Sequence, residues 1–490
     1  MANQQIMVID EGTTSTRAML FRADGKHLAT RQRDLTQYYP KPGLVEHDAA
    51  EIWERTLACA QEIVADAGGP QAVAAIGITN QRETVIAWDR RSGEPLTRAI
   101  VWQDRRTDAT CHALKDAGHE PLVQAKTGLL LDPYFSASKM QWMLQNIPAV
   151  AAAGEHLCFG TVESYLIFRL TGGLHISDAS NASRTMLLAL DANDWDEELC
   201  TLFSIPRRSL PEIRDCAGDL GTTIAEYFGA PIAITGSAGD QQAATIGQGC
   251  LTRGDTKATF GTGAFILSNS GKTPPKSNNR LLATVLCQVN GQRHYALEGS
   301  IFAAGSVIKW LRDDVEMIGS ASDSEALARS VTDTGGVVIV PALSGLGAPH
   351  WRADVRAAIT GLSFATRRAH IVRAALEAMA HQCHDLKAAF AADGVDWGLL
   401  KVDGGMVAND WLVQDLADML DINVKRPTFF ETTALGAAML AAVGCDIYPD
   451  ISSATAMIAG FDSFVSSMDP ATRTSRIALW ETAVAERLSA

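Results

Sequence analysis

The sequence predicts an α/β protein in which two domains, each with a mixed β-sheet flanked by helices, enclose a cleft. Two observations support this prediction. The chain has 490 residues, which is too many for one ordinary hydrophobic core. A strand, a Gly/Thr turn and a second strand occur at residues 6–21 and again at residues 256–269. We therefore expect two related domains, residues 1–248 and 249–490, that each present such a turn to a shared cleft.

The composition excludes several classes of protein. Apolar residues make up 47% of the chain and charged residues 20%, which is typical of a folded globular protein. The net charge is −14 and no basic run occurs, which argues against nucleic acid or an anionic membrane as a partner. We find neither a long apolar stretch nor a secretory signal pattern. The 9 cysteines lack any C-x-x-C pair, which is typical of reduced thiols, so we expect a cytoplasmic protein without an integral membrane partner.

The first strand–turn–strand unit has the residue types that suit a phosphate ligand. An apolar run at residues 6–9 leads into Asp10, so a buried strand carries a carboxylate to its end. Gly12 permits a tight turn, and Arg17 follows after several hydroxyl residues. These hydroxyl residues include Thr13, Thr14 and Ser15. Backbone N–H groups and hydroxyls can donate to phosphate, and Asp10 can hold a divalent cation. The alternative is an ordinary hairpin in which Gly and Thr serve only the turn.

Polar clusters follow other predicted elements of the first half. Arg82 and Glu83 come after a short buried strand at residues 73–78 and can clamp substrate hydroxyls, although an edge-strand ion pair is an equal alternative. Trp102 adjoins a second polar cluster and can form an apolar wall against a polyol. Tyr134 lies in a loop that leads into a helix. Together these residues suggest a site for a ligand rich in hydroxyl groups.

Asp240 follows a glycine-rich turn at the start of a predicted helix. Its ordinary role there is an N-cap, which stabilises a helix by about 1 kcal/mol. At the floor of a cleft it can instead act as a general base or a metal ligand, and the helix N-terminus favours anionic groups nearby. The second half repeats the plan with a hairpin at residues 261–263 and a diglycine turn at residues 404–405.

Taken together, these motifs resemble the glycerol-phosphorylating members of the FGGY family of carbohydrate kinases, within the actin, hexokinase and Hsp70 superfamily. The resemblance runs from about residue 6 to about residue 445. The matching segments are residues 12–15, 80–84, 181–186, 239–243 and 403–405, with two longer signatures at 134–146 and 357–377. The resemblance implies two actin-like (ribonuclease H-like) domains, with the polyol mainly on the first and the nucleotide mainly on the second.

The resemblance also implies a reaction and its residues. The expected reaction is in-line transfer of the γ-phosphoryl group of ATP to glycerol, giving sn-glycerol 3-phosphate for glycerol catabolism, with Mg²⁺ as the metal. Asp240 would be the general base, and Asp10 and Asp240 the metal ligands. The implied polyol site consists of Arg82, Glu83, Trp102, Tyr134, Asp240, Gln241 and Phe265. The implied nucleotide site consists of Thr13, Thr14, Ser15, Arg17, Thr262, Gly305, Lys309, Gly405 and Asn409.

Two other functions compete with this interpretation. A kinase for another polyol or ketose, such as erythritol or xylulose, would need a smaller residue at Trp102, Tyr134 or Phe265. A polymerising or chaperone-like ATPase of the same superfamily would lack the polyol pocket. Glu11 stands where the resembled enzymes usually carry Gln, which predicts an added negative charge beside the phosphate turn and a lowered affinity for ATP. Lys309 also stands where Gln is common. We further expect a homodimer or homotetramer.

Overall fold

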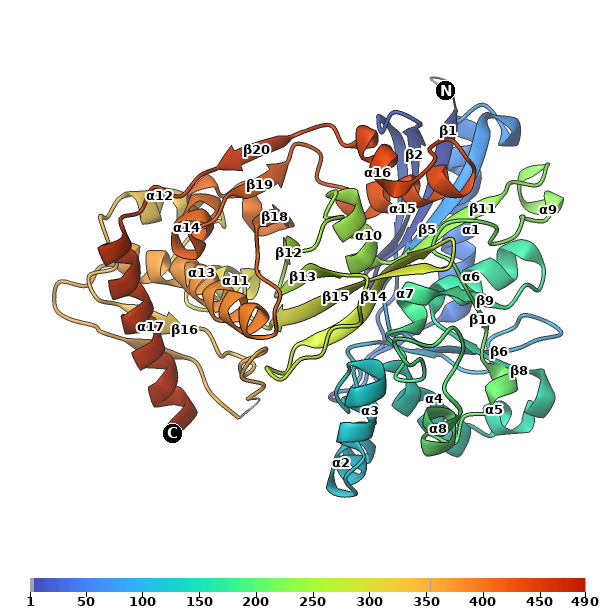
Figure 1. Cartoon of the computed structure of the whole chain (residues 1–490), viewed down its shortest axis with the longest axis horizontal. Coiled ribbons are helices and arrows are strands. Elements are labelled where there is room, and N and C mark those ends of the chain that lie inside the picture. The colour runs from blue at the N-terminus through green and yellow to red at the C-terminus, as the bar shows by residue number, and fades with distance from the viewer. Residues whose placement is uncertain (1–3, 353, 490) are drawn as a thin grey trace.

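Two mixed β-sheets, one from each half of the chain, form the centre of the computed structural model, which describes residues 4–352 and 354–489 (Figure 1). The first sheet has the order β11-β5-β1-β2-β3. Its strands are β1 (Gln5–Glu11), β2 (Ser15–Arg22), β3 (His27–Asp34), β5 (Val73–Asn80) and β11 (Ile234–Gly239). The pairs β1–β2 and β2–β3 are antiparallel, whereas β1, β5 and β11 run parallel. The mixed sheet and the first hairpin were both predicted from the sequence.

The parallel strands fix where the polar residues gather. The apolar residues of β1 at positions 6–9 are fully buried, because helix α1 (Ala49–Asp66) covers one face of the sheet and α15 (Thr432–Gly444) packs against the other. Side chains that follow the carboxyl ends of parallel strands lie at one edge of the sheet. Asp10, Arg82 and Asp240 stand at or just after the ends of β1, β5 and β11, and they therefore meet there.

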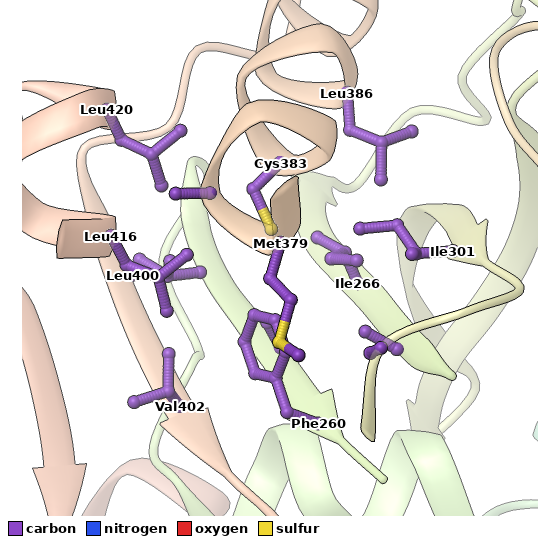
Figure 2. Close-up of a cluster of buried hydrophobic side chains, with 14 of the residues drawn as sticks. Phe260, Ile266, Ile301, Met379, Cys383, Leu386, Leu400, Val402, Leu416 and Leu420 are labelled. Atoms are coloured by element: carbon purple, nitrogen blue, oxygen red, sulfur yellow. The ribbon is translucent and has the colours of Figure 1, made fainter. Parts of the chain in front are cut away.

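The second sheet has the order β14-β15-β13-β12-β18-β19-β20. Its strands are β12 (Asp255–Phe260), β13 (Ala264–Gly271), β14 (Leu282–Val289), β15 (Gln292–Ile301), β18 (Leu399–Asp403), β19 (Val424–Pro427) and β20 (Phe461–Phe464). Helices α13 (Arg368–Ala392) and α14 (Asp410–Leu420) cover it. Figure 2 shows Met379 and Cys383 of α13 packed among Phe260, Val402 and Leu416. All of these side chains are buried, so this layer is the hydrophobic core of the second half.

Helix α15 belongs to the second half of the sequence but packs on the first sheet. A Cβ atom at Gly77 of β5 would lie 2.4 Å from the carbonyl oxygen of Ala437, and one at Gly436 would lie 1.8 Å from that of Ala243 in α10 (Asp240–Gly247). Only glycine permits such close backbone contact. All strands of the first sheet thus precede the predicted boundary at residues 248/249, and all strands of the second sheet follow it. Helix α15 also follows this boundary, but it packs on the first sheet. The assignment of whole domains to 1–248 and 249–490 stays a prediction.

The remaining elements surround the two sheets. The other helices are α2 (Asp108–Asp116), α3 (Glu120–Thr127), α4 (Ser136–Asn146), α5 (Pro148–Ala152), α6 (Val162–Thr171), α7 (Ala179–Ala182), α8 (Glu197–Leu202), α9 (Ala225–Phe228), α11 (Gly305–Asp313), α12 (Asp323–Arg329), α16 (Ile451–Ala454) and α17 (Pro470–Ser489). The short strands are β4 (Glu46–His47), β6 (Ile86–Asp89), β7 (Ala99–Ile100), β8 (Leu157–Gly160), β9 (Ile176–Asp178), β10 (Glu212–Arg214), β16 (Val338–Val340) and β17 (Ala358–Thr360). Within the described ranges, we find no helix with the length and apolar character that a membrane crossing requires.

Candidate active site

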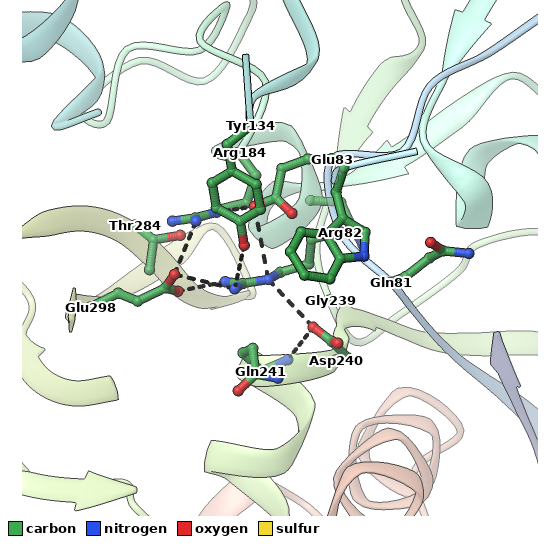
Figure 3. A network of polar contacts seen from close by, with 12 residues as sticks. Gln81, Arg82, Glu83, Tyr134, Arg184, Gly239, Asp240, Gln241, Thr284 and Glu298 are labelled. Atoms are coloured by element: carbon green, nitrogen blue, oxygen red, sulfur yellow. Dashed lines mark hydrogen bonds and ion pairs between the residues drawn. The ribbon is translucent and has the colours of Figure 1, made fainter. Parts of the chain in front are cut away.

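A network of buried charges lies where the two sheets meet (Figure 3). Arg82 follows β5, and its Nη1 atom donates to Oε2 of Glu298 on β15 over 2.6 Å. The Nε atom of Arg82 lies 3.3 Å from Oδ1 of Asp240, and Nη2 donates to Oη of Tyr134 over 3.3 Å. The Arg82 side chain is 2% exposed, so these partners fix its guanidinium in one position. The structure thus joins three of the predicted polyol-site residues to Glu298.

A second arginine completes the network. The Nε atom of Arg184 donates to Oε1 of Glu83 over 2.7 Å, and its Nη2 atom donates to Oε1 of Glu298 over 3.1 Å. Burial alone would raise the pKa of Glu298, but Arg184 and Arg82 outweigh it and lower that pKa to about 2. Glu298 is therefore ionised at neutral pH. Burial instead raises the pKa of Glu83, although Arg82 and Arg184 oppose that effect.

Asp240 is the accessible carboxylate of this network. It is the first residue of α10, where the N-cap is Gly239, so its side chain does not serve as the cap that the ordinary interpretation required. Its Oδ1 atom accepts from the backbone N–H of Gln241 over 2.7 Å, and its side chain is 34% exposed. Withdrawal from water raises the pKa of Asp240, against the opposing effect of Arg82 and Lys257. A group with these properties can accept a proton from a bound hydroxyl.

Three aromatic rings stand together beside these charges, as the sequence interpretation requires. The ring centroid of Trp102 lies 5.6 Å from that of Tyr134 and 6.4 Å from that of Phe265, both in edge-on orientations. Phe265 lies on β13 of the second sheet, whereas Trp102 and Tyr134 belong to the first half of the chain. The rings therefore form an apolar wall with contributions from both halves. Gln241 lies close by, and its Oε1 atom accepts from Nζ of Lys257 over 2.5 Å.

The first predicted phosphate turn lies directly next to this wall. The backbone N–H of Gly12 donates to the carbonyl of Ser15 over 3.0 Å and closes the turn between β1 and β2. The indole Nε1 atom of Trp102 donates to Oγ1 of Thr13 over 3.0 Å, and Thr14 is exposed at the tip. Arg17 points back along the hairpin, where it pairs with Asp10. This turn thus contacts Trp102, one of the residues that were predicted to bind the polyol.

Arg17 also has a partner from the end of the chain that the sequence interpretation missed. Its Nη1 atom lies 2.7 Å from Oε2 of Glu431, the residue before α15. Burial raises the pKa of Asp10, although Arg17 opposes that effect. The predicted phosphate ligand Arg17 is thus shared between two carboxylates in this structure.

Glu11 corrects one prediction. Side chains alternate along β1, so Glu11 faces away from Asp10 and lies against α1, where Oγ1 of Thr56 donates to its Oε2 atom over 2.9 Å. Glu11 is fully buried, and this burial raises its pKa to about 8. The carboxyl is therefore mostly protonated at pH 7. The predicted negative charge beside the phosphate turn was wrong, because a protonated Glu is a neutral hydrogen-bonding group like Gln.

The second predicted phosphate turn packs against α11. The backbone N–H of Gly305 donates to the carbonyl of Gly261 over 2.9 Å, and that of Ser306 donates to the carbonyl of Thr262 over 3.0 Å. A Cβ atom at Gly305 would lie 2.5 Å from the carbonyl oxygen of Gly261 and 3.1 Å from the side chain of Met406. The segment after the diglycine turn therefore lies beside this hairpin.

The other predicted nucleotide residues lie around the same segment. Gly405 is exposed, and a Cβ atom added there would have no neighbouring atom within 4 Å. Asn409 caps α14 by accepting from the backbone N–H of Leu412 over 3.0 Å. Lys309 is exposed on α11. Gly305 thus lies against Met406, which follows Gly405 and precedes Asn409 in the chain, and Lys309 lies farther along the helix that begins at Gly305.

The residues that sequence reasoning missed are charged side chains in apolar surroundings. Glu298 interrupts the buried strand β15, and Lys257 does the same in β12; both are fully buried. Arg184 lies within a motif that was noted, but no role was assigned to it. A charge in an otherwise apolar strand is costly unless it is paired, so this pattern alone would have identified Glu298 and Lys257.

The donor set fits Mg²⁺ bound together with a nucleotide. Asp10 and Asp240 offer carboxylate oxygens, which are hard ligands. Across residues 4–352 and 354–489 we find no cluster of three or more His, Cys, Asp or Glu side chains that suits a metal ion. Mg²⁺ commonly takes only one or two protein carboxylates and fills its other positions with water and phosphate oxygens.

Comparison with known proteins identifies relatives over nearly the whole chain. The model of the FGGY family of carbohydrate kinases matches as an N-terminal domain at residues 5–247 and a C-terminal domain at residues 256–445. The glycerol kinase of Rhodospirillum rubrum is 55% identical over 449 residues, covering 90% of each chain. That of Methylobacterium nodulans is 51% identical over 488 residues, covering 98% of this chain and 97% of the relative. The crystal structure of Plasmodium falciparum glycerol kinase with ADP is 36% identical, with a TM-score of 0.95 and coverage of 99% of this chain and 98% of that one.

Proposed function

The chain belongs to the FGGY family of carbohydrate kinases, and on this premise we propose that it phosphorylates glycerol with ATP to give sn-glycerol 3-phosphate. The observation that carries the proposal is the 3.0 Å hydrogen bond from Nε1 of Trp102 to Oγ1 of Thr13. It joins an aromatic wall that suits a small polyol to a turn that suits phosphate, so a hydroxyl and a γ-phosphoryl group can meet there. The similarity to known glycerol kinases supports this choice of substrate.

The polyol site combines charged groups with the aromatic wall. Arg82 and Gln241 supply N–H donors for substrate oxygens, while Glu83 and Asp240 supply acceptors for substrate hydroxyls. Trp102, Tyr134 and Phe265 complete the set and cover the carbon chain. Because Arg82 is already held by Glu298 and Asp240, little side-chain freedom is lost on binding. Analogues that lack a hydroxyl would leave these buried groups unpaired and bind poorly.

In the proposed reaction, Asp240 accepts the proton of a terminal glycerol hydroxyl as its oxygen attacks the γ-phosphorus in line. The new O–P bond forms as the bond from phosphorus to the β–γ bridging oxygen breaks, and ADP leaves. The hairpin hydroxyls and N–H groups stabilise negative charge on the transferring phosphoryl group. Arg17 and Thr262 add to this set, the latter from the second hairpin. Mg²⁺, held by Asp10 and Asp240, would neutralise charge on the phosphates.

The nucleotide would extend from the first hairpin toward the second sheet. Thr13, Thr14, Ser15 and Arg17 would meet the phosphates, and Gly305, Lys309, Gly405 and Asn409 would surround the adenosine. This arrangement corresponds to a polyol-binding and catalytic domain at 1–248 and a nucleotide-binding domain at 249–490. We expect the enzyme to act in the cytoplasm, in glycerol catabolism, as a homodimer or homotetramer.

The identity of the product tests this proposal. The purified protein is incubated with MgATP and glycerol, and the product is assayed with a dehydrogenase specific for sn-glycerol 3-phosphate. Formation of that stereoisomer in amounts equal to the ADP released is the expected result. Phosphorylation of erythritol or xylulose in place of glycerol would assign the same site to a different member of the family.

A further inference from the structure

Two glutamines hold the first phosphate turn from its buried side, and a histidine lies between them. The Nε2 atom of Gln81 donates to the carbonyl of Gly12 over 3.1 Å, and that of Gln37 donates to the carbonyl of Thr13 over 2.6 Å. His47 places its Nε2 atom 2.9 Å from Oε1 of Gln37 and its Nδ1 atom 3.3 Å from Nε2 of Gln81. The histidine therefore contacts both glutamines that support the turn.

The backbone carbonyls of Gly12 and Thr13, to which the two glutamines bond, fix the donor and the acceptor in every hydrogen bond of this group. Carbonyl oxygens only accept, so each glutamine must present its NH2 group to the turn. Gln37 then offers Oε1 to His47, so Nε2 of the imidazole must carry a proton. Gln81 donates to Nδ1, which must be unprotonated. The neutral tautomer with its proton on Nε2 satisfies all four bonds, and burial lowers the pKa of His47 to about 4, which keeps the ring neutral.

The same group extends to the polyol wall and closes into a ring. Oγ1 of Thr84 donates to Oε1 of Gln81 over 3.0 Å and accepts from the backbone N–H of Trp102 over 3.2 Å. The indole of Trp102 donates to Oγ1 of Thr13 over 3.0 Å. Because the Thr13 hydroxyl accepts from the indole, its own proton is directed away from the indole and can be donated to a ligand. The turn and the wall are thus fixed relative to one another.

The position of His47 is itself set by short-range structure. It ends the two-residue strand β4, which pairs with β7 so that His47 stands opposite Ala99, three residues before Trp102. Asp48 follows immediately and caps α1 by accepting from the N–H of Ala50 over 2.9 Å. His47 is 1% exposed and cannot shift without disturbing a strand pair or a helix start.

We propose that His47 is a positioning residue for phosphoryl-group binding, which acts by locking Gln37 and Gln81 in the orientation that holds the Gly12–Thr13 turn. The inference rests on the proposed binding of nucleotide phosphate at that turn. A buried histidine that served only the core would have no preferential influence on the nucleotide. The ring nitrogens of His47 bond to Gln37 and Gln81 and not to the turn itself, so its effect passes through the two glutamines.

The test compares nucleotide binding in variants of the full-length protein. His47→Leu removes both hydrogen bonds, His47→Gln retains an amide donor and acceptor, and the Mg²⁺ complex of the ATP analogue AMPPNP is titrated by calorimetry. We expect His47→Leu to bind about tenfold more weakly, as the loss of about one hydrogen bond to the turn implies, and His47→Gln to lose less. The KM for glycerol should change by less than about threefold, because the hydrogen-bond partners of the His47 ring, Gln37 and Gln81, are not residues of the proposed polyol site.

His175 provides a matched control. It is also buried, and its Nε2 atom bonds to the carbonyl of Phe159 over 2.8 Å, remote in sequence from the turn. His175→Leu should lower thermal stability but leave the affinity for MgAMPPNP unchanged. Gln37→Leu removes the donor to Thr13 directly, so its effect and that of His47→Leu should be less than additive in the double variant.

Two results would overturn the proposal. One is a folded His47→Leu variant that binds MgAMPPNP within about twofold of the wild type. The other is an equal loss of affinity in His175→Leu. If His47→Leu fails to fold, Gln37→Leu is measured in its place, because Gln37 joins His47 to the turn. A folded Gln37→Leu variant that binds MgAMPPNP within about twofold of the wild type would then overturn the proposal. The binding assay contains no polyol, so a wild type that binds the analogue but leaves glycerol unphosphorylated refutes the proposed function alone.

Discussion

The guanidinium of Arg82 donates to the carboxylate of Glu298 over 2.6 Å, although 216 residues separate them in the sequence. Arg82 follows a strand of the first sheet, and Glu298 lies within the second. The pair therefore links the two halves of the chain at the floor of the candidate site. It also orients Arg82 before any ligand arrives, because the second contact, from Nη2 to Oε1, spans 3.2 Å and makes the pair bidentate.

Replacing Glu298 by Gln should reduce both stability and activity. The change leaves Arg82 and Arg184 buried without a full counter-charge, which typically costs about 3–5 kcal/mol. Urea unfolding and kcat/KM for glycerol measure the two effects. Glu62→Gln serves as the control, since that side chain is 46% exposed in its pair with Arg33 and should change little. A folded Glu298→Gln enzyme with wild-type KM would show that Arg82 needs no such partner.

Asp240→Asn should nearly abolish turnover while the protein still folds. The amide cannot accept the hydroxyl proton, and the loss of a general base typically lowers kcat by about 10²–10⁴-fold. The thermal unfolding temperature should stay close to that of the wild type, because the side chain is 34% exposed and does not cap α10. Near-normal kcat in the folded variant would remove Asp240 from the mechanism.

Glu11→Gln should stabilise the protein in a pH-dependent manner. The pKa of Glu11 is about 8 in the folded chain against an ordinary 4.5, so the unfolded chain loses its proton first as the pH rises. Below pH 4.5 Glu11 does not lower the free energy of unfolding of the wild type. That free energy then falls as the pH rises to about 8. Gln does not titrate, so the variant lacks this fall. The free energy of unfolding, measured in urea at pH 5 and pH 8, should be higher for the variant than for the wild type, and this difference should be larger at pH 8. Equal gains at both values would mean that Glu11 is ionised in the folded state.

Glu431→Gln should increase the affinity for ATP. Glu431 competes with nucleotide phosphate for Arg17, and its side chain is 40% exposed, so the pair contributes at most about 1 kcal/mol. Removing the charge should lower the KM for MgATP by up to about fivefold, with a smaller effect at high salt. A KM that rises in Glu431→Gln would instead assign Glu431 a supporting role in nucleotide binding.

The sequence predicts local structure and motif chemistry well, because both depend on near neighbours. The two hairpins and the mixed sheets follow from apolar runs and turn residues. The meeting of Asp10, Arg82 and Asp240 follows from the parallel strands that carry them. Relationships set by distant packing were not predictable in this way. The crossing of α15 onto the first sheet is one example.

The charge state of Glu11 is a second example of the same limit. Its carboxyl is neutral because α1 covers it, and no property of residues 6–17 reveals which face of β1 that helix occupies. The pairing of Glu298 with Arg184 likewise depends on two elements that meet only in the folded chain. In each case the decisive quantity is burial, which is a property of the tertiary structure.

The most direct test of the central claim measures ADP formation by the purified protein with MgATP, in the presence of glycerol and then of erythritol, xylulose and longer polyols. We expect rapid turnover with glycerol and little with the larger compounds, because a larger substrate would need a smaller side chain at Trp102, Tyr134 or Phe265, and these three rings stand together. Turnover with a larger polyol while glycerol stays inert would contradict the substrate assignment. ADP formation that is indifferent to every polyol would contradict the proposal that this chain is a polyol kinase.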